Sequence, residues 1–213
     1  KIYTMLLYAL FLLGGCEQQN KHQQRFLQFG TIVDVTLISE VDTALEVFTD
    51  IENLLIQRHH QWHGWENGAL KQFNDALSTA DDSVTIPPIL EQLIADSSYY
   101  FKQTGGLFNP AMGKLIAAWG FHDHSEPDQT AIQRIKKDIP GMDDLVIKNQ
   151  LAQSTHPDLR LDFGAIAKGL AVRQIARLLD RQGIENYIIN AGGDIFSRGH
   201  KQNNQSWRIA IED

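Results

Sequence analysis

The sequence predicts an α+β fold, a mixed α/β domain in which helices pack against a largely antiparallel sheet. Two observations predict it: apolar residues recur at three- and four-residue spacing in several segments, and short β-branched, alternating stretches lie between those segments. The 213 residues are 43% hydrophobic and 21% charged, which is enough for one substantial domain with its own core. We find no internal repeat and no clear domain linker, so one domain is expected.

The first half of the chain is expected to hold one strand and two helices. Residues 28–38 (QFGTIVDVTLI) alternate and are rich in β-branched side chains, which is typical of a strand. A helix is expected over 42–57, with Asp42 as its cap and apolar residues on one face. A second helix is expected over 88–103, because Pro88 suits a first helical turn.

The second half alternates shorter elements. A polar helix is expected over 128–137. A strand over 159–163 leads through a glycine-bearing turn into a long helix over 166–181. Further strands are expected over 186–190 and 206–211. Since the last strand has no partner after it, we expect the fold to continue further, with its C-terminal part missing from this sequence.

The charge of the chain excludes one class of partner. The formal net charge is -7 and the sequence pI is near 5.6, with no cluster of Lys and Arg. Binding to a phosphate backbone needs such a cluster, so we expect no nucleic acid. An anionic ligand would need a local cation or backbone amides.

The N-terminus predicts a lipid anchor. An apolar run over 2–13 is too short to span a bilayer but suits a signal-peptide core, and Leu-Gly-Gly precedes Cys16. Small residues before a cysteine match the bacterial lipobox. We therefore expect a signal peptide over 1–16, lipidation at Cys16, a polar tether over 17–25 and the folded domain over 26–213. The alternative is a buried N-terminal element with an incidental cysteine.

The most informative segment for chemistry is 161–170 (LDFGAIAKGL). A strand delivers Asp162 to a turn of small residues, and the helix that follows directs its first amides at whatever lies in front of it. Lys168 is one turn into that helix. An acid, open backbone and a cation suit a phosphate-bearing ligand with a metal. Taken alone, small residues at such a turn are more often simple packing.

Two further segments offer aromatic surface. Residues 105–121 supply flat apolar side chains that could wall a flavin or adenine ring, although a helix with aromatic core residues explains the same spacing. In residues 59–74 three histidines invite a metal interpretation, which their spacing and the absence of a nearby cysteine disfavour. Trp65 in that segment is better suited to stack on an aromatic ligand.

Together these motifs resemble the ApbE family of FAD:protein FMN transferases. Five segments match in the family's order and span nearly all of 26–211. Each is unspecific alone, but five in order are hard to obtain by chance. The matching segments are Phe29-Gly30-Thr31, His63-Gly64-Trp65 through Phe73-Asn74, Phe108-Asn109-Pro110 through Trp119-Gly120-Phe121, residues 161–169, and residues 190–195.

The resemblance implies a T-fold-like domain with an FAD site. Phe29 and Trp65 would line the flavin and adenine rings, and Asp162 would hold polar groups of FAD. Lys168 would face the phosphates, and the Ala165 carbonyl would bind Mg²⁺. A further wall would come from Leu107, Phe108 and Asn109.

The implied reaction is transfer of FMN from FAD to a threonine hydroxyl of a target flavoprotein, with release of AMP. The alternatives are an FAD pyrophosphatase giving FMN and AMP, a non-catalytic FAD-binding lipoprotein, and an envelope lipoprotein of structural or adhesive function. Many family members are envelope lipoproteins, so we expect the periplasmic side of a bacterial envelope. The inner membrane is our expectation, but Glu17 after Cys16 is no decisive sorting signal.

Three departures from the family's pattern bear on the site. Phe29 replaces a usual methionine and preserves an apolar contact, whereas Asn109 replaces a usual aspartate and removes a charge. The family's His-x-Ile-Asp-Pro segment, and a later Asp and Thr that complete the metal site, have no counterpart here. We therefore expect the catalytic residue, which remains unknown, beyond Asp213.

Overall fold

The computed structural model describes residues 20–79, 82–122 and 124–210. The expected signal peptide over 1–16, the lipidation site Cys16 and residues 17–19 of the expected tether lie outside the described residues. Among the helices within these ranges, none combines the length and the hydrophobicity that crossing a membrane requires.

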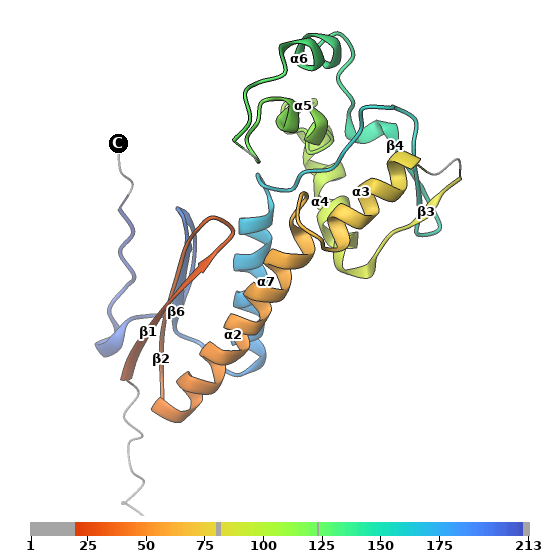
Figure 1. Ribbon diagram of the computed structural model, residues 1–213. Coiled ribbons are helices and arrows are strands. Elements are labelled where there is room, and N and C mark those ends of the chain that lie inside the picture. The colour runs from red at the N-terminus through yellow and green to blue at the C-terminus, as the bar shows by residue number, and fades with distance from the viewer. Residues whose placement is uncertain (1–19, 80–81, 123, 211–213) are drawn as a thin grey trace, which may run out of the picture.

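The larger sheet is antiparallel and has the order β1-β2-β6-β7 (Figure 1). Alternate residues of its two central strands point to one face, and on that face Val33, Val35, Tyr187 and Ile189 are buried. The strands are β1 (Asn20–Gln28), β2 (Thr31–Ser39), β6 (Tyr187–Ala191) and β7 (Asp194–Arg198).

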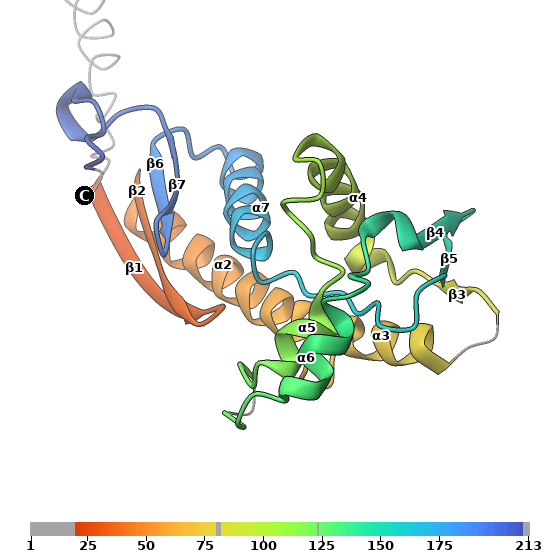
Figure 2. The same ribbon diagram turned by 90° about the horizontal axis from the view of Figure 1, so that it is seen from above.

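Two long helices cover the buried face of this sheet. They are α2 (Val41–Trp62) and α7 (Ala167–Arg181), which lie side by side next to the sheet in both views (Figures 1 and 2). Their inward residues, among them Ile51, Leu55 and Ile175, belong to one continuous apolar core with the strands. Burial of this shared core is the main source of stability for the domain.

A second group of elements lies toward the other end of α2 (Figures 1 and 2). Its small sheet is antiparallel with the order β3-β5-β4, and the group also contains four helices. The elements are α3 (Ala69–Thr79), β3 (Val84–Thr85), α4 (Pro88–Gln103), α5 (Gly113–Ala118), α6 (Gln129–Ile135), a 3-10 turn η2 (Met142–Asp144), β4 (Leu145–Lys148) and β5 (Leu151–Ser154); a second turn, η3 (Gln202–Asn204), follows β7.

The predicted fold class is confirmed, since helices pack on antiparallel sheets, but several boundaries differ. Residues 20–25, expected as tether, form part of β1, whose backbone pairs with β2 over its whole length from Asn20 opposite Ser39. Its polar composition fits an exposed edge strand. The helix expected over 42–57 begins at Val41, so Asp42 lies in its first turn, and it continues to Trp62.

Two expected strands are absent from the described residues. Residues 159–163 form an extended segment with a single bridge, between Arg160 and Met112, and residues 206–210 adopt no regular structure. Neither segment has a neighbouring strand to complete a ladder, and apolar alternation alone does not supply one.

Tyr187, at the start of β6, makes the stability of the fold depend on pH in the alkaline range. Its side chain is fully buried, and its hydroxyl donates a hydrogen bond of 2.7 Å to Asp180 Oδ1 on α7. Burial, followed by this bond to a carboxylate, raises the pKa of Tyr187 from 10.0 to about 12. The folded protein therefore keeps this proton at pH values where the unfolded chain loses it.

We expect the protein to lose stability at alkaline pH because of this tyrosine. The stabilisation that the protonated Tyr187 gives the folded state is fully present below pH 10 and is lost as the pH rises toward about 12. Tyr187→Phe should reduce the free energy of unfolding by about 1 kcal/mol at pH 7 and flatten its decline above pH 10. Urea unfolding at several pH values measures both, with the exposed Tyr99→Phe as control. An unchanged alkaline slope in Tyr187→Phe would contradict this account.

Candidate functional site

A cavity of about 260 Å³ lies where the β1–β2 turn, the end of α2 and the start of α7 meet. Both ribbon views place these three segments next to one another (Figures 1 and 2). The cavity combines aromatic walls with a carboxylate and an ammonium group. Its lining is Phe29, Gly30, His59, Trp62, His63, Gly64, Trp65, His122, Asp162, Phe163, Gly164, Ala167 and Lys168.

Asp162 is held as a fixed hydrogen-bond acceptor inside this cavity. Its Oδ1 accepts from the Gly164 amide at 2.8 Å, and its Oδ2 accepts from Trp65 Nε1 at 3.2 Å. The same Oδ2 lies 3.5 Å from His122 Nε2. Only 15% of the carboxylate side chain is exposed. Its remaining lone pairs can receive hydroxyl or amide groups of a ligand.

The backbone that carries Asp162 is fixed from two sides. The Asp162 amide donates to the Pro110 carbonyl at 2.8 Å, on the segment that precedes α5. On the other side, the buried Asn74 of α3 bonds both backbone groups of Leu161: Nδ2 donates to the carbonyl at 2.9 Å, and Oδ1 accepts from the amide at 2.8 Å. A side-chain amide thus takes the place of a neighbouring strand.

Trp65 contributes a wall whose ring is in contact with two further side chains. The His122 ring stacks on it with centroids 4.0 Å apart and an interplanar angle of 28°. The Arg160 guanidinium lies 4.6 Å from the centroid, a cation–π distance. Arg160 is itself tied to the Gly64 carbonyl at 2.9 Å and to Asp75 at 3.1 Å. The indole is therefore held at its edge and over its ring.

Phe29 forms another part of the cavity lining. It lies in a turn with unusual backbone geometry. The two-residue connection between β1 and β2 has φ of 56° at Phe29 and 66° at Gly30, as a type I′ hairpin turn requires. A bulky residue rarely adopts positive φ, and the strain is on the order of 1 kcal/mol. The Phe29 amide donates to His59 Nδ1 at 3.1 Å, which stabilises the turn.

The start of α7 supplies the charge for an anion. No side chain caps this helix, and although the Ala167 amide donates to the Phe163 carbonyl at 2.8 Å, the positive end of the helix dipole favours an anion in front of it. Lys168 lines the same cavity from the first turn. Among the described residues, no carboxylate pairs with its ammonium group. Lys168 and the helix start can therefore neutralise phosphate oxygens.

Four of the predicted site residues thus come together: Phe29, Trp65, Asp162 and Lys168. Ala165 instead lines a separate cavity of about 270 Å³. The side chains that line that cavity with it include Asp96, Tyr100, Arg173 and Asp194.

The expected wall from Leu107, Phe108 and Asn109 does not line the cavity. Leu107 is 90% exposed, and Phe108 packs edge-on against Tyr100 with centroids 6.3 Å apart. Asn109 has a structural role, because Nδ2 donates to the Pro140 carbonyl at 2.8 Å and Oδ1 accepts from the Ala111 amide at 3.1 Å. These bonds fix Asn109 outside the lining of this cavity, so the predicted wall stays a prediction.

Several lining residues were not predicted. His59 was considered only as a metal ligand, and His63 as a metal ligand and as part of a family segment, with no role in the cavity lining. Among the described residues no group of three or more His, Cys, Asp or Glu is arranged to hold a metal ion. His59 lies in the last turn of α2 and His63 directly follows that helix, so their four-residue spacing was the available signal that the two rings lie close together. His122 had no signal beyond its place after an aromatic motif.

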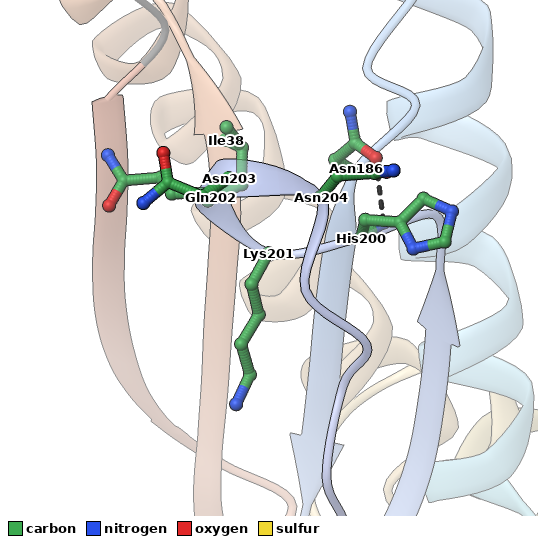
Figure 3. A pocket seen from close by; sticks show the side chains of 7 residues that line it. All are labelled: Ile38, Asn186, His200, Lys201, Gln202, Asn203 and Asn204. Carbon is green, nitrogen blue, oxygen red and sulfur yellow. Dashed lines mark hydrogen bonds between the residues drawn. The ribbon is translucent and has the colours of Figure 1, made fainter.

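A larger cavity of about 430 Å³ lies elsewhere and is a weaker candidate. Its lining is polar and comes mostly from the segment after β7, with His200 donating its amide to Asn186 Oδ1 at 2.8 Å (Figure 3). In Figure 3 the Lys201 side chain points away from Asn186 and His200. Without an aromatic wall or convergent charges, this cavity lacks the features of a cofactor site.

Comparison with known proteins identifies the family of this chain. The model of the ApbE family matches residues 29–213. An FAD:protein FMN transferase of Rhodobacter capsulatus is 31% identical over 195 residues, which cover 89% of this chain and 37% of that protein. One of Vibrio cholerae is 28% identical, covering 99% of this chain and 64% of that protein. The chain thus spans between about a third and two thirds of these relatives.

Solved structures agree in fold. The flavin transferase ApbE from Vibrio cholerae superposes with a TM-score of 0.80 at 25% identity, covering 91% of this chain and 64% of that one. The apo form of a flavinyl transferase from Pseudomonas stutzeri gives the same TM-score at 23% identity and covers 91% of this chain and 66% of that one.

Proposed function

The chain belongs to the ApbE family, and from that premise we propose that it provides the FAD site of an enzyme that transfers FMN from FAD to a threonine hydroxyl of a target flavoprotein, releasing AMP. The observation that carries the proposal is the convergence of Phe29, Trp65, Asp162 and Lys168 on one cavity. Aromatic walls suit the flat rings of FAD, and a cation at a helix start suits its pyrophosphate.

Each of these residues has a distinct task in the proposed reaction. Trp65 and Phe29 bind and orient the rings, and Asp162 accepts hydrogen bonds from polar groups of FAD. Lys168 neutralises charge on the phosphate oxygens as the bond to AMP breaks. In phosphoryl transfer, positioning and charge neutralisation supply most of the catalysis. The base that removes the threonine proton is not assigned among the described residues.

The proposed cofactor ion is Mg²⁺, for which the start of α7 offers part of a site. Ala165 lines a cavity together with Asp96 and Asp194, and carbonyl and carboxylate oxygens are the donors that a hard cation prefers. Asp96 is already hydrogen-bonded to Arg173, so the described residues supply a partial ligand set. When bound, the ion would add to the neutralisation of phosphate charge.

We also propose that the protein is anchored by a lipid on Cys16 at the periplasmic side of a bacterial envelope, with the inner membrane as the expected location. The apolar run and lipobox-like residues before Cys16 support this. Labelling with a radioactive fatty acid tests the anchor: incorporation should disappear in Cys16→Ala, and equal incorporation would contradict it.

The proposed function is tested by incubating the full-length protein with FAD, Mg²⁺ and an acceptor flavoprotein. We expect AMP release together with covalent flavin fluorescence on the acceptor, and loss of the label when the acceptor threonine is changed to alanine. AMP without labelled acceptor would favour an FAD pyrophosphatase. Bound FAD with neither product would leave a binding protein.

Lys168→Met should weaken FAD binding about tenfold, because a charge-assisted bond to phosphate contributes roughly 1.5–3 kcal/mol and solvent screens part of it. The measurement is the dissociation constant of FAD by calorimetry. Lys136→Met, on an exposed residue just after α6, is the matched control and should leave binding unchanged. Equal affinity of Lys168→Met and wild type would remove Lys168 from the site.

A further inference from the structure

Two histidines at the end of α2 use the same ring nitrogen in the same way. His59 Nδ1 accepts a hydrogen bond of 3.1 Å from the Phe29 amide. His63 Nδ1 accepts from the amides of Trp65, at 3.3 Å, and Glu66, at 3.0 Å. Both histidines line the cavity, so each has a structural task beside the aromatic residues.

These bonds define the protonation state of both rings. A ring nitrogen that accepts a hydrogen bond carries no proton, so each neutral imidazole holds its proton on Nε2. In His63 that Nε2 lies 3.8 Å from Glu66 Oε1, which suits a donor. A proton added at Nδ1 would turn the acceptor into a donor that faces another N–H group.

The amides held in this way belong to the residues that form the aromatic lining. Phe29 adopts a positive φ that it would not favour alone, and its ring meets the His59 ring edge-on with centroids 5.5 Å apart. His59 in turn contacts His63, with centroids 5.6 Å apart. The β1–β2 turn and the loop that follows α2 are thus both tied to one end of that helix.

We propose that His59 and His63 are positioning residues that set the aromatic walls Phe29 and Trp65, and that FAD binds tightly only while the His59 ring is neutral. The identity of the ligand in this statement rests on the proposed function, whereas the positioning role stands on the hydrogen bonds. The histidine-rich segment, which does not form a metal site in the described residues, acquires a function in this way.

The surroundings of His59 favour its neutral form. Burial lowers the pKa of His59 from its ordinary 6.5, and the neighbouring His63 and His60 lower it further, whereas Glu66 acts in the opposite direction. The other charged and titratable groups that line this cavity are Lys168, Asp162 and His122. The wall at Phe29 is therefore held above pH 6.5 and is released as the pH falls through the lowered pKa of His59.

Substitution of His59 separates its acceptor role from its ring. In His59→Asn the side-chain oxygen still accepts from the Phe29 amide but no longer titrates, whereas His59→Phe keeps a ring and loses the acceptor. FAD affinity of the wild type should fall between pH 7.5 and pH 5.5 by at most about tenfold, the loss that an unshifted required histidine would give, because the pKa of His59 is lowered. His59→Asn should vary less than about threefold over that range, and His59→Phe should bind weakly throughout.

The exposed His200 provides the matched control, since it lies outside the cavity lining and does not act on the pKa of His59. His200→Asn should follow the wild-type pH profile. A His59→Asn profile that follows the wild type would overturn the proposal, as would wild-type affinity in His59→Phe.

A ligand-free readout separates this proposal from the proposed function. Imidazole ¹⁵N chemical shifts of the full-length protein at pH 7.5 should show an unprotonated Nδ1 in both His59 and His63, and the Phe29 amide should lose protection from exchange at pH 5.5. If the protein binds no FAD, the proposed function fails and these spectra alone decide the role of the pair. A protonated Nδ1 at pH 7.5 would overturn it.

Discussion

Replacement of Asp162 with alanine is expected to weaken FAD binding about a hundredfold or more, the largest effect on ligand binding that we predict. Four interactions end together. The Gly164 amide and Trp65 Nε1 lose an acceptor at 2.8 and 3.2 Å, His122 loses the carboxylate 3.5 Å away, and FAD loses its own acceptor. The indole wall is then free to turn.

Calorimetric titration with FAD measures this effect, and two variants define its origin. Asp162→Asn retains one carbonyl oxygen, so its affinity should lie between those of wild type and Asp162→Ala. Asp138→Ala removes a carboxylate that is 88% exposed and should leave binding unchanged. FAD affinity of Asp162→Ala within a factor of three of the wild type would show that this carboxylate does not belong to the site.

The second large effect concerns stability. Asn74→Leu should lower the free energy of unfolding by about 3 kcal/mol, because it leaves the amide and carbonyl of Leu161 without partners in a buried position. Asn74 is 1% exposed, and its two bonds of 2.8 and 2.9 Å are the side-chain contacts that hold this backbone segment. The segment carries Asp162, so the loss should reach the site as well.

Urea denaturation followed by circular dichroism measures the change, and Asn67→Ala, at an exposed position just before α3, is the control. That control should stay within about 0.5 kcal/mol of the wild type. A loss below about 1 kcal/mol in Asn74→Leu would mean that water or a backbone shift satisfies Leu161, contrary to our account. FAD affinity of the variant, measured below its unfolding transition, then shows whether Asp162 has moved.

Local patterns predicted the parts of the site that a short segment builds by itself. Asp162 and Lys168 lie within seven residues, on a turn and the first turn of a helix, and the structure brings both to the cavity. The long helices were predicted for the same reason, because their apolar period reports directly on the buried face. Trp65 was predicted as a stacking surface from its own segment, whereas Phe29 and its grouping with Trp65 came from the family resemblance.

The features that the sequence did not predict have a different physical origin. They depend on which distant segments of the chain pair or form hydrogen bonds with each other. β1 is polar because it is an edge strand, and its existence depends on pairing with β2 rather than on its own composition. Asn109 follows two apolar residues, but its bonds to Pro140 and Ala111 decide where they point. The side chain of Asn74 takes the place of a neighbouring strand beside Leu161, and no periodic pattern in the sequence predicts such a hydrogen bond.

The most direct test of the central claim is a crystal structure of the protein with bound FAD. Our account predicts that the flat rings of FAD lie against the aromatic lining formed by Trp65 and Phe29. It also predicts that the pyrophosphate lies within reach of Lys168 at the start of α7. FAD in the polar cavity of Figure 3, or against Leu107 and Phe108 with the cavity at Trp65 empty, would contradict it.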